Sequence, residues 1–123
     1  MNKTYIICVD DEKMVLESLK TELKEQFGKD YRIETADNAT DAMELVNELL
    51  GDNQEIPVVI SDYVMPLIKG DELLTNIHQV SPKTLKILLT GQATMEGVTN
   101  SINNAIEYYK LFNFCQQIIS LNI

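Results

Sequence analysis

The sequence predicts an α/β domain in which five parallel strands form a doubly wound sheet with helices on both faces. Short apolar runs alternate along the chain with longer stretches whose apolar residues recur every three or four positions. The run at residues 57–61 (PVVIS) shows no polar alternation, which is typical of a strand buried on both faces. Right-handed crossovers between successive strands would then make the sheet parallel.

The first half of the chain is predicted to contain two strand–helix pairs. Residues 5–9 form the first buried strand, and residues 13–27 form a helix that Gly28 ends. The apolar face of this helix consists of Val15, Leu16, Leu19, Leu23 and Phe27. Residues 31–35 form the second strand, and Asn38 caps a helix that ends near Gly51.

The second half is predicted to continue the same alternation. Its elements in order are a strand at 57–61, a helix at 71–79, a strand at 85–89, a helix at 94–105, a strand at 108–112 and a last helix, short or truncated, at 115–121. His78 is expected to lie on the exposed side of its helix, because no cluster of metal-ligating residues accompanies it. We expect residues 1–123 to form a single domain.

Composition excludes several function classes. Nineteen acidic and ten basic residues give a net charge of −9, which argues against coating nucleic acid directly or binding an anionic membrane. The two cysteines, Cys8 and Cys115, provide no disulfide framework. No apolar run is long enough for a signal peptide or a membrane span, so the expected location is the cytoplasm.

Polar residues follow three of the predicted strands. Asp10, Asp11 and Glu12 follow the first strand, Asp62 follows the third, and Thr90 follows the fourth. In a doubly wound sheet the carboxyl ends of the strands meet at one edge, where ligands bind near the topological switch point. We therefore expect these side chains to form one site.

Crowded carboxylates favour a hard divalent cation. Like charges held close together raise the pKa of at least one acid unless a cation is present, and Mg²⁺ is the most plausible cation for such oxygen ligands. An aspartate beside Mg²⁺ can act as a nucleophile toward phosphorus and form an acyl phosphate. The hydroxyl of Thr90 could donate a hydrogen bond to a phosphate oxygen.

Three segments resemble the receiver domains of response regulators. Residues 62–70 (DYVMPLIKG) are similar to the D-x-x-M-P-x-x-x-G signature of that family. Asp10 and Asp11 resemble its acidic pair, and residues 88–93 (LLTGQA) resemble its fourth-strand switch motif. The three matches occur in the family's order, and together they cover residues 4 to about 109. The resemblance implies the flavodoxin-like receiver fold.

The resemblance also implies roles for individual residues. Asp62 would be the phosphoacceptor and, with Asp11, would bind Mg²⁺ directly. Asp10 would bind the metal through water or assist its binding, and the main-chain carbonyl of Val64 would be a further ligand. Thr90 would be the switch hydroxyl that moves toward the phosphoryl group.

Further positions would shape the surroundings of the phosphoryl group. The side chains of Val64 and Gln92 would flank it and control the access of water. Met65, Pro66 and Gly70 would set the loop geometry, because proline fixes φ and glycine permits a positive φ.

The chain departs from the family pattern after the fifth strand. The family's Lys-Pro pair, whose lysine contacts the phosphoryl group, has no counterpart, and Lys110 is the only basic residue after residue 105. Side chains alternate along a strand, so an offset of one residue would direct Lys110 to the other face. Either the strand is shifted and Lys110 is a displaced cation that reaches the site, or the site lacks this cation.

The function that the resemblance implies is signalling rather than enzymatic turnover. A histidine kinase or phosphotransfer protein would supply the phosphoryl group to Asp62 in the presence of Mg²⁺. Phosphorylation would bias a two-state equilibrium and change the surface of the fourth helix, the fifth strand and the last helix. That surface would contact an output domain or effector protein, and the chain could dimerise.

Two other functions compete with this interpretation. A degenerate receiver would bind partners without phosphorylation, and the missing Lys-Pro pair favours it. A small Mg²⁺-dependent phosphatase would also form an aspartyl phosphate, but it needs a second carboxylate two residues after the nucleophile. Val64 occupies that position, which counts against the phosphatase.

Overall fold

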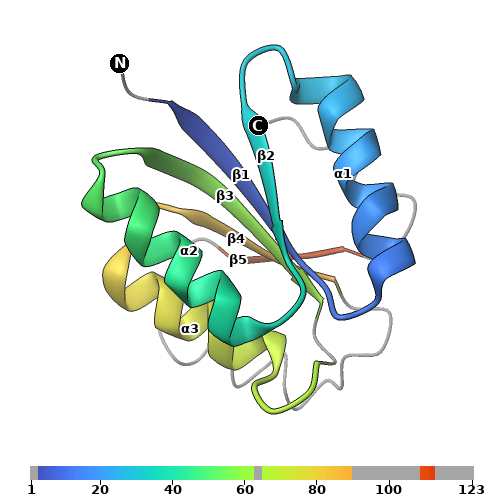
Figure 1. Cartoon of the computed structure of the whole chain (residues 1–123). Helices are drawn as coiled ribbons and strands as arrows, with labels where there is room; N and C mark the ends of the chain where they lie inside the picture. Colours follow the sequence, from blue (N-terminus) through green and yellow to red (C-terminus); the bar gives the residue numbers. More distant parts are fainter. Residues whose placement is uncertain (1–2, 63–64, 90–108, 113–123) are drawn as a thin grey trace.

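A computed structural model describes residues 3–62, 65–89 and 109–112 of the chain. Eight elements follow one another in these ranges: β1 (Thr4–Val9), α1 (Lys13–Phe27), β2 (Arg32–Ala36), α2 (Ala39–Gly51), β3 (Glu55–Asp62), α3 (Gly70–Val80), β4 (Leu85–Leu89) and β5 (Tyr109–Phe112). Figure 1 shows them in the order of the chain. The expected helices at 94–105 and 115–121 lie outside the described residues.

The five strands form one sheet in the order β2-β1-β3-β4-β5, and every neighbouring pair is parallel. The predicted doubly wound parallel sheet is therefore confirmed. The chain first moves outward from β1 to β2 and then continues from β3 on the other side of β1 (Figure 1). The carboxyl ends of β1 and β3 consequently flank the switch point, where a ligand site is expected.

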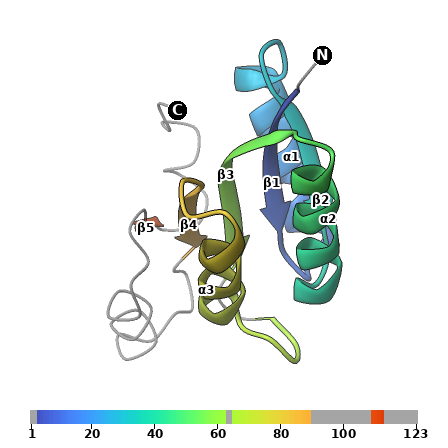
Figure 2. The same cartoon turned by 90° about the vertical axis from the view of Figure 1, so that its left-hand side faces the viewer.

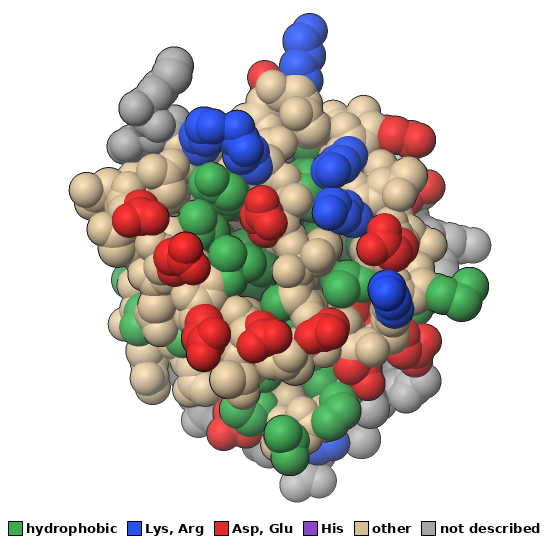
Figure 3. Space-filling view, viewed as in Figure 1, with side chains coloured by type: hydrophobic (Ala, Val, Ile, Leu, Met, Phe, Trp, Pro, Cys, Tyr) green, Lys and Arg blue, Asp and Glu red, His purple; other side chains and the backbone are tan. Residues whose placement is uncertain are grey.

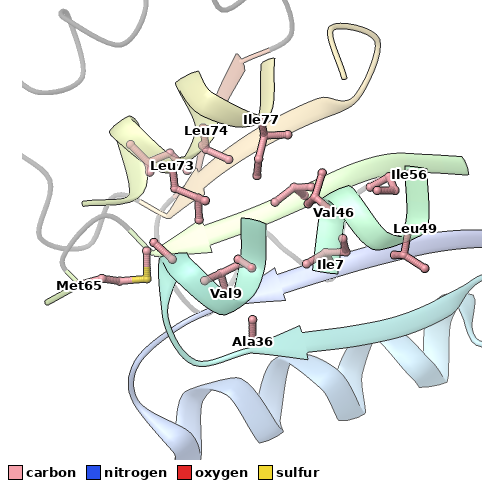
Figure 4. Close-up of a cluster of buried hydrophobic side chains, with 14 residues drawn as sticks. Ile7, Val9, Ala36, Val46, Leu49, Ile56, Met65, Leu73, Leu74 and Ile77 are labelled. Carbon is pink, nitrogen blue, oxygen red and sulfur yellow. The ribbon is translucent and has the colours of Figure 1, made fainter. Parts of the chain in front are cut away.

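Helices cover both faces of this sheet. α1 lies on one side, whereas α2 and α3 lie together on the other, as the two views in Figures 1 and 2 show. Leu16, Leu19 and Leu23 of α1 pack with one cluster of buried residues. Figure 4 shows the second cluster, in which side chains of α2 and α3 meet those of the strands. Apolar faces that alternate along the strands thus supply two separate cores.

The predicted element bounds agree closely with those observed. α1 and β4 span the predicted residues, and the other described elements differ at either end by two residues or fewer. The largest difference is β3, which extends over residues 55–62 and includes Asp62 as its last residue. Its pairing with β1 is irregular between Thr4 and Ile6, beside Pro57, which has no N–H to donate to the ladder.

The cap predicted for the second helix is also confirmed. The side chain of Asn38 caps α2 by accepting a hydrogen bond of 2.8 Å from the main-chain N–H of Asp41. Cys8 is fully buried, and this burial raises the pKa of its thiol to about 12. A thiol in this state is a small apolar core group without nucleophilic character. Among the described residues, no helix combines the length and apolar character needed to cross a membrane.

β4 differs from a purely apolar strand at one position. Lys86 is fully buried, and its ammonium donates to the main-chain oxygens of Thr84 (2.7 Å), Pro82 (3.3 Å) and Ser81 (3.4 Å). It also makes a 2.9 Å hydrogen bond with Nδ1 of His78. His78 is therefore half-buried and hydrogen-bonded, which corrects the expectation of an exposed surface residue.

Candidate functional site

Three carboxylates converge where β1 and β3 end. Val9 pairs with Ser61, so Asp10, which follows β1, lies beside Asp62 at the end of β3. Asp10, Asp11 and Asp62 each offer one oxygen, and these atoms lie within 4.8 Å of one another. The predicted meeting of the two strand ends therefore occurs, and it brings Asp62 beside acidic side chains that lie more than fifty residues earlier in the sequence.

Asp10 is the buried member of this cluster, with 2% of its surface exposed. Its main-chain N–H continues the ladder by donating to Ala36 (3.2 Å), and its Oδ1 accepts from the N–H of Glu12 (2.8 Å). The latter bond turns the chain from β1 into α1. Burial raises the pKa of Asp10, and the charges of Asp11 and Glu12 raise it further, although the hydrogen bond from Glu12 opposes the shift.

The main chain at Asp62 is held from two sides. The hydroxyl of Ser61 donates to the carbonyl oxygen of Asp62 at 2.9 Å, and α3 begins against the same carbonyl at Gly70. A Cβ on residue 70 would overlap that oxygen and would lie 2.9 Å from the carbonyl carbon. The end of β3 is therefore fixed relative to the first turn of α3.

This contact corrects the physical role expected for Gly70. Gly70 does not have a positive φ, whereas Leu67 in the same loop does, at 68°. The glycine is needed because its main chain approaches Asp62 too closely for a side chain. The loop's left-handed residue is instead a leucine, which is uncommon for a bulky side chain.

The two other predicted loop residues have different surroundings. Met65 is buried, with 5% of its surface exposed, and joins the core cluster beside α2 and α3 (Figure 4). Pro66 is exposed, and its carbonyl oxygen accepts a 2.8 Å hydrogen bond from the N–H of Ile68. Met65 thus anchors the loop, while Pro66 lies at a tight turn on its surface.

Several predicted site residues lie outside the described part of the chain. These are Val64, Thr90 and Gln92. Their roles as metal ligand, switch hydroxyl and flanking side chains stay predictions.

The register of β5 locates Lys110 relative to the cluster. Asp62 pairs with Leu89 and Leu89 with Phe112, so Phe112 is level with Asp62. Lys110 pairs with Ile87, two residues before that level. Two strand residues correspond to roughly 6.6 Å along the sheet. Lys110 therefore lies within the strand and not at its carboxyl end.

Ser61 is a site residue that sequence reasoning missed. It is fully buried between β1 and β4, and it supports the main chain of Asp62. The available signal was a hydroxyl in an otherwise apolar strand, directly before the acidic residue. A buried hydroxyl requires a hydrogen-bond acceptor, and the adjacent carbonyl provides it.

The donor set fits a hard divalent cation. All three side chains offer carboxylate oxygens, and burial has left Asp10 with a raised pKa that a nearby positive charge would lower. Oxygen ligands of this kind suit Mg²⁺, which binds through one or two carboxylates together with water and phosphate oxygens. Such a site can hold a metal beside an aspartate that attacks phosphorus.

Comparison with known proteins identifies related chains. The family described as the response regulator receiver domain matches residues 6–110. The hydrogenase transcriptional regulatory protein HoxA of Cupriavidus necator is 27% identical over 100 residues, which are 81% of this chain and 19% of that protein. HoxA of Bradyrhizobium diazoefficiens is 26% identical over the same shares. The chain thus spans about a fifth of the length of these curated relatives.

Solved structures agree with this relationship. The signal receiver domain of an HD domain-containing protein from Pseudomonas fluorescens has 30% identity and a TM-score of 0.76, with 92% of this chain and 83% of that chain covered. A CheY-like response regulator receiver domain protein from Methanospirillum hungatei has 27% identity and a TM-score of 0.73, with 89% and 82% covered. Both share the flavodoxin-like arrangement of strands and helices described above.

Proposed function

Because the chain belongs to the response regulator receiver domain family of two-component signalling, we propose that Asp62 accepts a phosphoryl group from a phosphohistidine. A histidine kinase or phosphotransfer protein would be the donor, and the acidic cluster would bind Mg²⁺. The observation that carries this proposal is the convergence of Asp10, Asp11 and Asp62 within 4.8 Å.

The chemistry assigns each carboxylate a different task. An oxygen of Asp62 attacks phosphorus, the phosphorus–nitrogen bond of the phosphohistidine breaks, and the imidazole nitrogen keeps the electron pair. Asp11 and Asp62 would hold the metal directly and Asp10 would hold it through water, with the main-chain carbonyl of Val64 as a further ligand. Mg²⁺ when bound neutralises the charge on the transferring group. Ser61 and Gly70 hold the main chain of Asp62 so that the nucleophile stays in place.

Exposed apolar side chains support a protein partner near this site. Met14, in the first turn of α1, is 85% exposed, and Leu67, in the loop after β3, is 100% exposed. Both belong to segments that leave the acidic end of the sheet. A partner that delivers a phosphoryl group to Asp62 would cover these side chains.

The consequence of phosphorylation is a change of surface rather than repeated turnover. Thr90 would move toward the phosphoryl group, with Val64 and Gln92 beside it. The surface formed by residues 94–105, β5 and residues 115–121 would then contact an output domain or effector, or a second copy of the chain. We class the protein as a cytoplasmic signalling module and not as an enzyme.

One observation favours a second candidate function. Lys110 lies two residues before the level of Asp62, so the register of β5 gives no support to Lys110 as a displaced phosphate partner. A receiver without that cation could bind its partners independently of phosphorylation.

Treatment with acetyl phosphate and Mg²⁺ separates the two functions. We expect intact-mass spectrometry to show one added phosphoryl group on the wild type and none on Asp62→Asn. Asp52→Asn is the matched control, because it makes the same charge change at an exposed position and should be modified like the wild type. An unmodified wild type would favour the phosphorylation-independent binding module.

A further inference from the structure

A second concave site lies at the opposite end of the sheet, where the strands begin. Its volume is about 640 Å³, and it is lined where β1 and β2 begin and α1 ends. Because the sheet is parallel, these strand starts lie at the far end from the acidic cluster (Figure 1). We propose that this cavity binds a multivalent anion carrying phosphate groups.

The charge of the lining carries the proposal. Lys3, Lys24, Lys29 and Arg32 line the cavity, so four of the chain's ten basic residues lie around one cavity of a protein whose net charge is −9. Figure 3 shows most of the Lys and Arg side chains of this face over its upper half, where acidic side chains also lie, and a row of acidic side chains across the middle. Two acidic residues, Asp30 and Glu34, also contribute to the lining.

These basic groups remain available to a ligand. In the ranges that the structure describes, none of the four forms an ion pair, although nineteen acidic residues are present in the chain. All four are exposed. Several unpaired cations around one cavity repel one another, and an anion with several charges relieves that repulsion.

Capping of the helix end does not account for this cluster. Two carbonyl oxygens at the end of α1 already accept main-chain hydrogen bonds: Lys24 from Gly28 at 2.9 Å, and Phe27 from Asp30 at 3.1 Å and from Tyr31 at 2.9 Å. Lysine side chains are therefore not needed as hydrogen-bond donors to these oxygens. Lys3 and Arg32 belong to the strand side of the cavity and not to the helix.

The walls give the cavity a defined shape. Tyr31 is half-buried, and its ring packs edge-on against Phe27 with 6.3 Å between the ring centroids. Ile33, with 5% of its surface exposed, provides an apolar part of the lining. The volume falls within the roughly 300–1,000 Å³ of small-molecule sites, so a ligand larger than a single phosphate fits.

Calorimetric titration of the full chain with pyrophosphate tests the proposal. The buffer contains chelator and no Mg²⁺, so metal-bridged binding at Asp62 cannot contribute, and failure here leaves the proposed phosphorylation untouched. We expect saturable binding, and a rise in Kd of about tenfold or more in Lys24→Gln/Arg32→Gln, because charge-assisted contacts are lost.

The control is Lys13→Gln/Lys83→Gln, which removes two exposed lysines outside the cavity and changes the net charge equally. It should retain the wild-type Kd. No saturable binding by the wild type, or an equal loss in both double variants, would overturn the proposal. Parallel titrations with ATP and tripolyphosphate, which carry the same number of phosphate groups, identify the source of the phosphates: tighter binding of ATP indicates a nucleotide, and equal or weaker binding of ATP indicates phosphate groups alone.

Discussion

The two ends of the sheet each contain a buried charged side chain, but the surroundings of the two charges are opposite. At the carboxyl end, Asp10 is 2% exposed, lies beside two more acids, and has a raised pKa. At the amino end, Lys86 is 0% exposed, and three main-chain oxygens and His78 surround its ammonium. The protein therefore solvates one buried charge internally and leaves the other in need of a cation.

This difference separates a structural role from a functional one. A buried charge that is surrounded by hydrogen-bond partners stabilises the local fold, because each partner would otherwise be unsatisfied. A group of like charges raises the free energy of the metal-free protein and creates a site for an ion. Substitutions of the buried charges at the two ends should therefore change stability in opposite directions when no metal is present.

Loss of the ammonium at the amino end should have the largest effect on stability. Lys86→Met removes the ammonium donor from the oxygens of Ser81, Pro82 and Thr84, although the Ser81 oxygen keeps a second donor, the N–H of Thr84 at 3.1 Å. We expect a loss of about 3 kcal/mol in the free energy of unfolding. Chemical denaturation measures it. Lys83→Met, at an exposed neighbouring position, should change stability by about 0.5 kcal/mol or less. Equal stability of Lys86→Met and the wild type would show that the ammonium contributes nothing net.

A methyl group at Gly70 should be the next most damaging change. It would overlap the carbonyl of Asp62, and we expect a loss of about 2 kcal/mol together with weaker Mg²⁺ binding. Gly51→Ala is the control, because a Cβ there meets nothing within 4 Å and alanine favours the helix, so stability should rise by about 0.5 kcal/mol. A Gly70→Ala protein with wild-type stability and Mg²⁺ affinity would contradict the close approach.

Neutralising Asp10 should stabilise the metal-free protein. Because folding raises the pKa of Asp10, its contribution favours the folded state at low pH and is lost as the pH rises through the raised value. In chelator at about pH 7, the free energy of unfolding of Asp10→Asn should exceed that of the wild type by about 1 kcal/mol. When the pH is raised from about 4 to about 7, the stability of Asp10→Asn should decrease less than that of the wild type.

Added Mg²⁺ should make the wild type more stable than Asp10→Asn, because binding of the ion stabilises the wild type more. Thermal unfolding with chelator and with Mg²⁺ measures both effects. Asp52→Asn, exposed and distant in sequence from the cluster, should follow the wild type in each condition. A less stable Asp10→Asn in chelator would mean that the carboxylate is already compensated.

The smallest effect is expected at His78. His78→Leu removes one of the four described partners of the Lys86 ammonium, which keeps its three main-chain oxygens, and the expected loss is about 0.5–1 kcal/mol. Gln79→Leu, at the exposed adjacent position, should be close to neutral. A loss as large as that of Lys86→Met would show that the imidazole, and not the carbonyl oxygens, holds the lysine.

Sequence periodicity was sufficient for the architecture. The bounds of α1 and β4 were predicted to the residue, because apolar spacing reports directly on which side of an element is buried. The meeting of Asp10 and Asp62 was also predictable, since parallel strands end at one edge whatever the side chains do. β3 was predicted too short at both ends, because only the apolar run from Pro57 was taken as strand and its polar last residue was taken as the start of a loop. Glu55, Ile56 and Asp62 were therefore left out.

By itself, then, the amino-acid order determined the strand and helix sequence and the edge at which acidic residues gather, since both depend on local spacing and connectivity. Only the tertiary structure decided that Lys86 is buried, that Gly70 meets the carbonyl of Asp62, and that basic residues before β1, at the end of α1 and in β2 line one cavity. Those features depend on which side chain of one element faces which atom of another. The spacing of apolar residues along the chain does not report such contacts between distant segments.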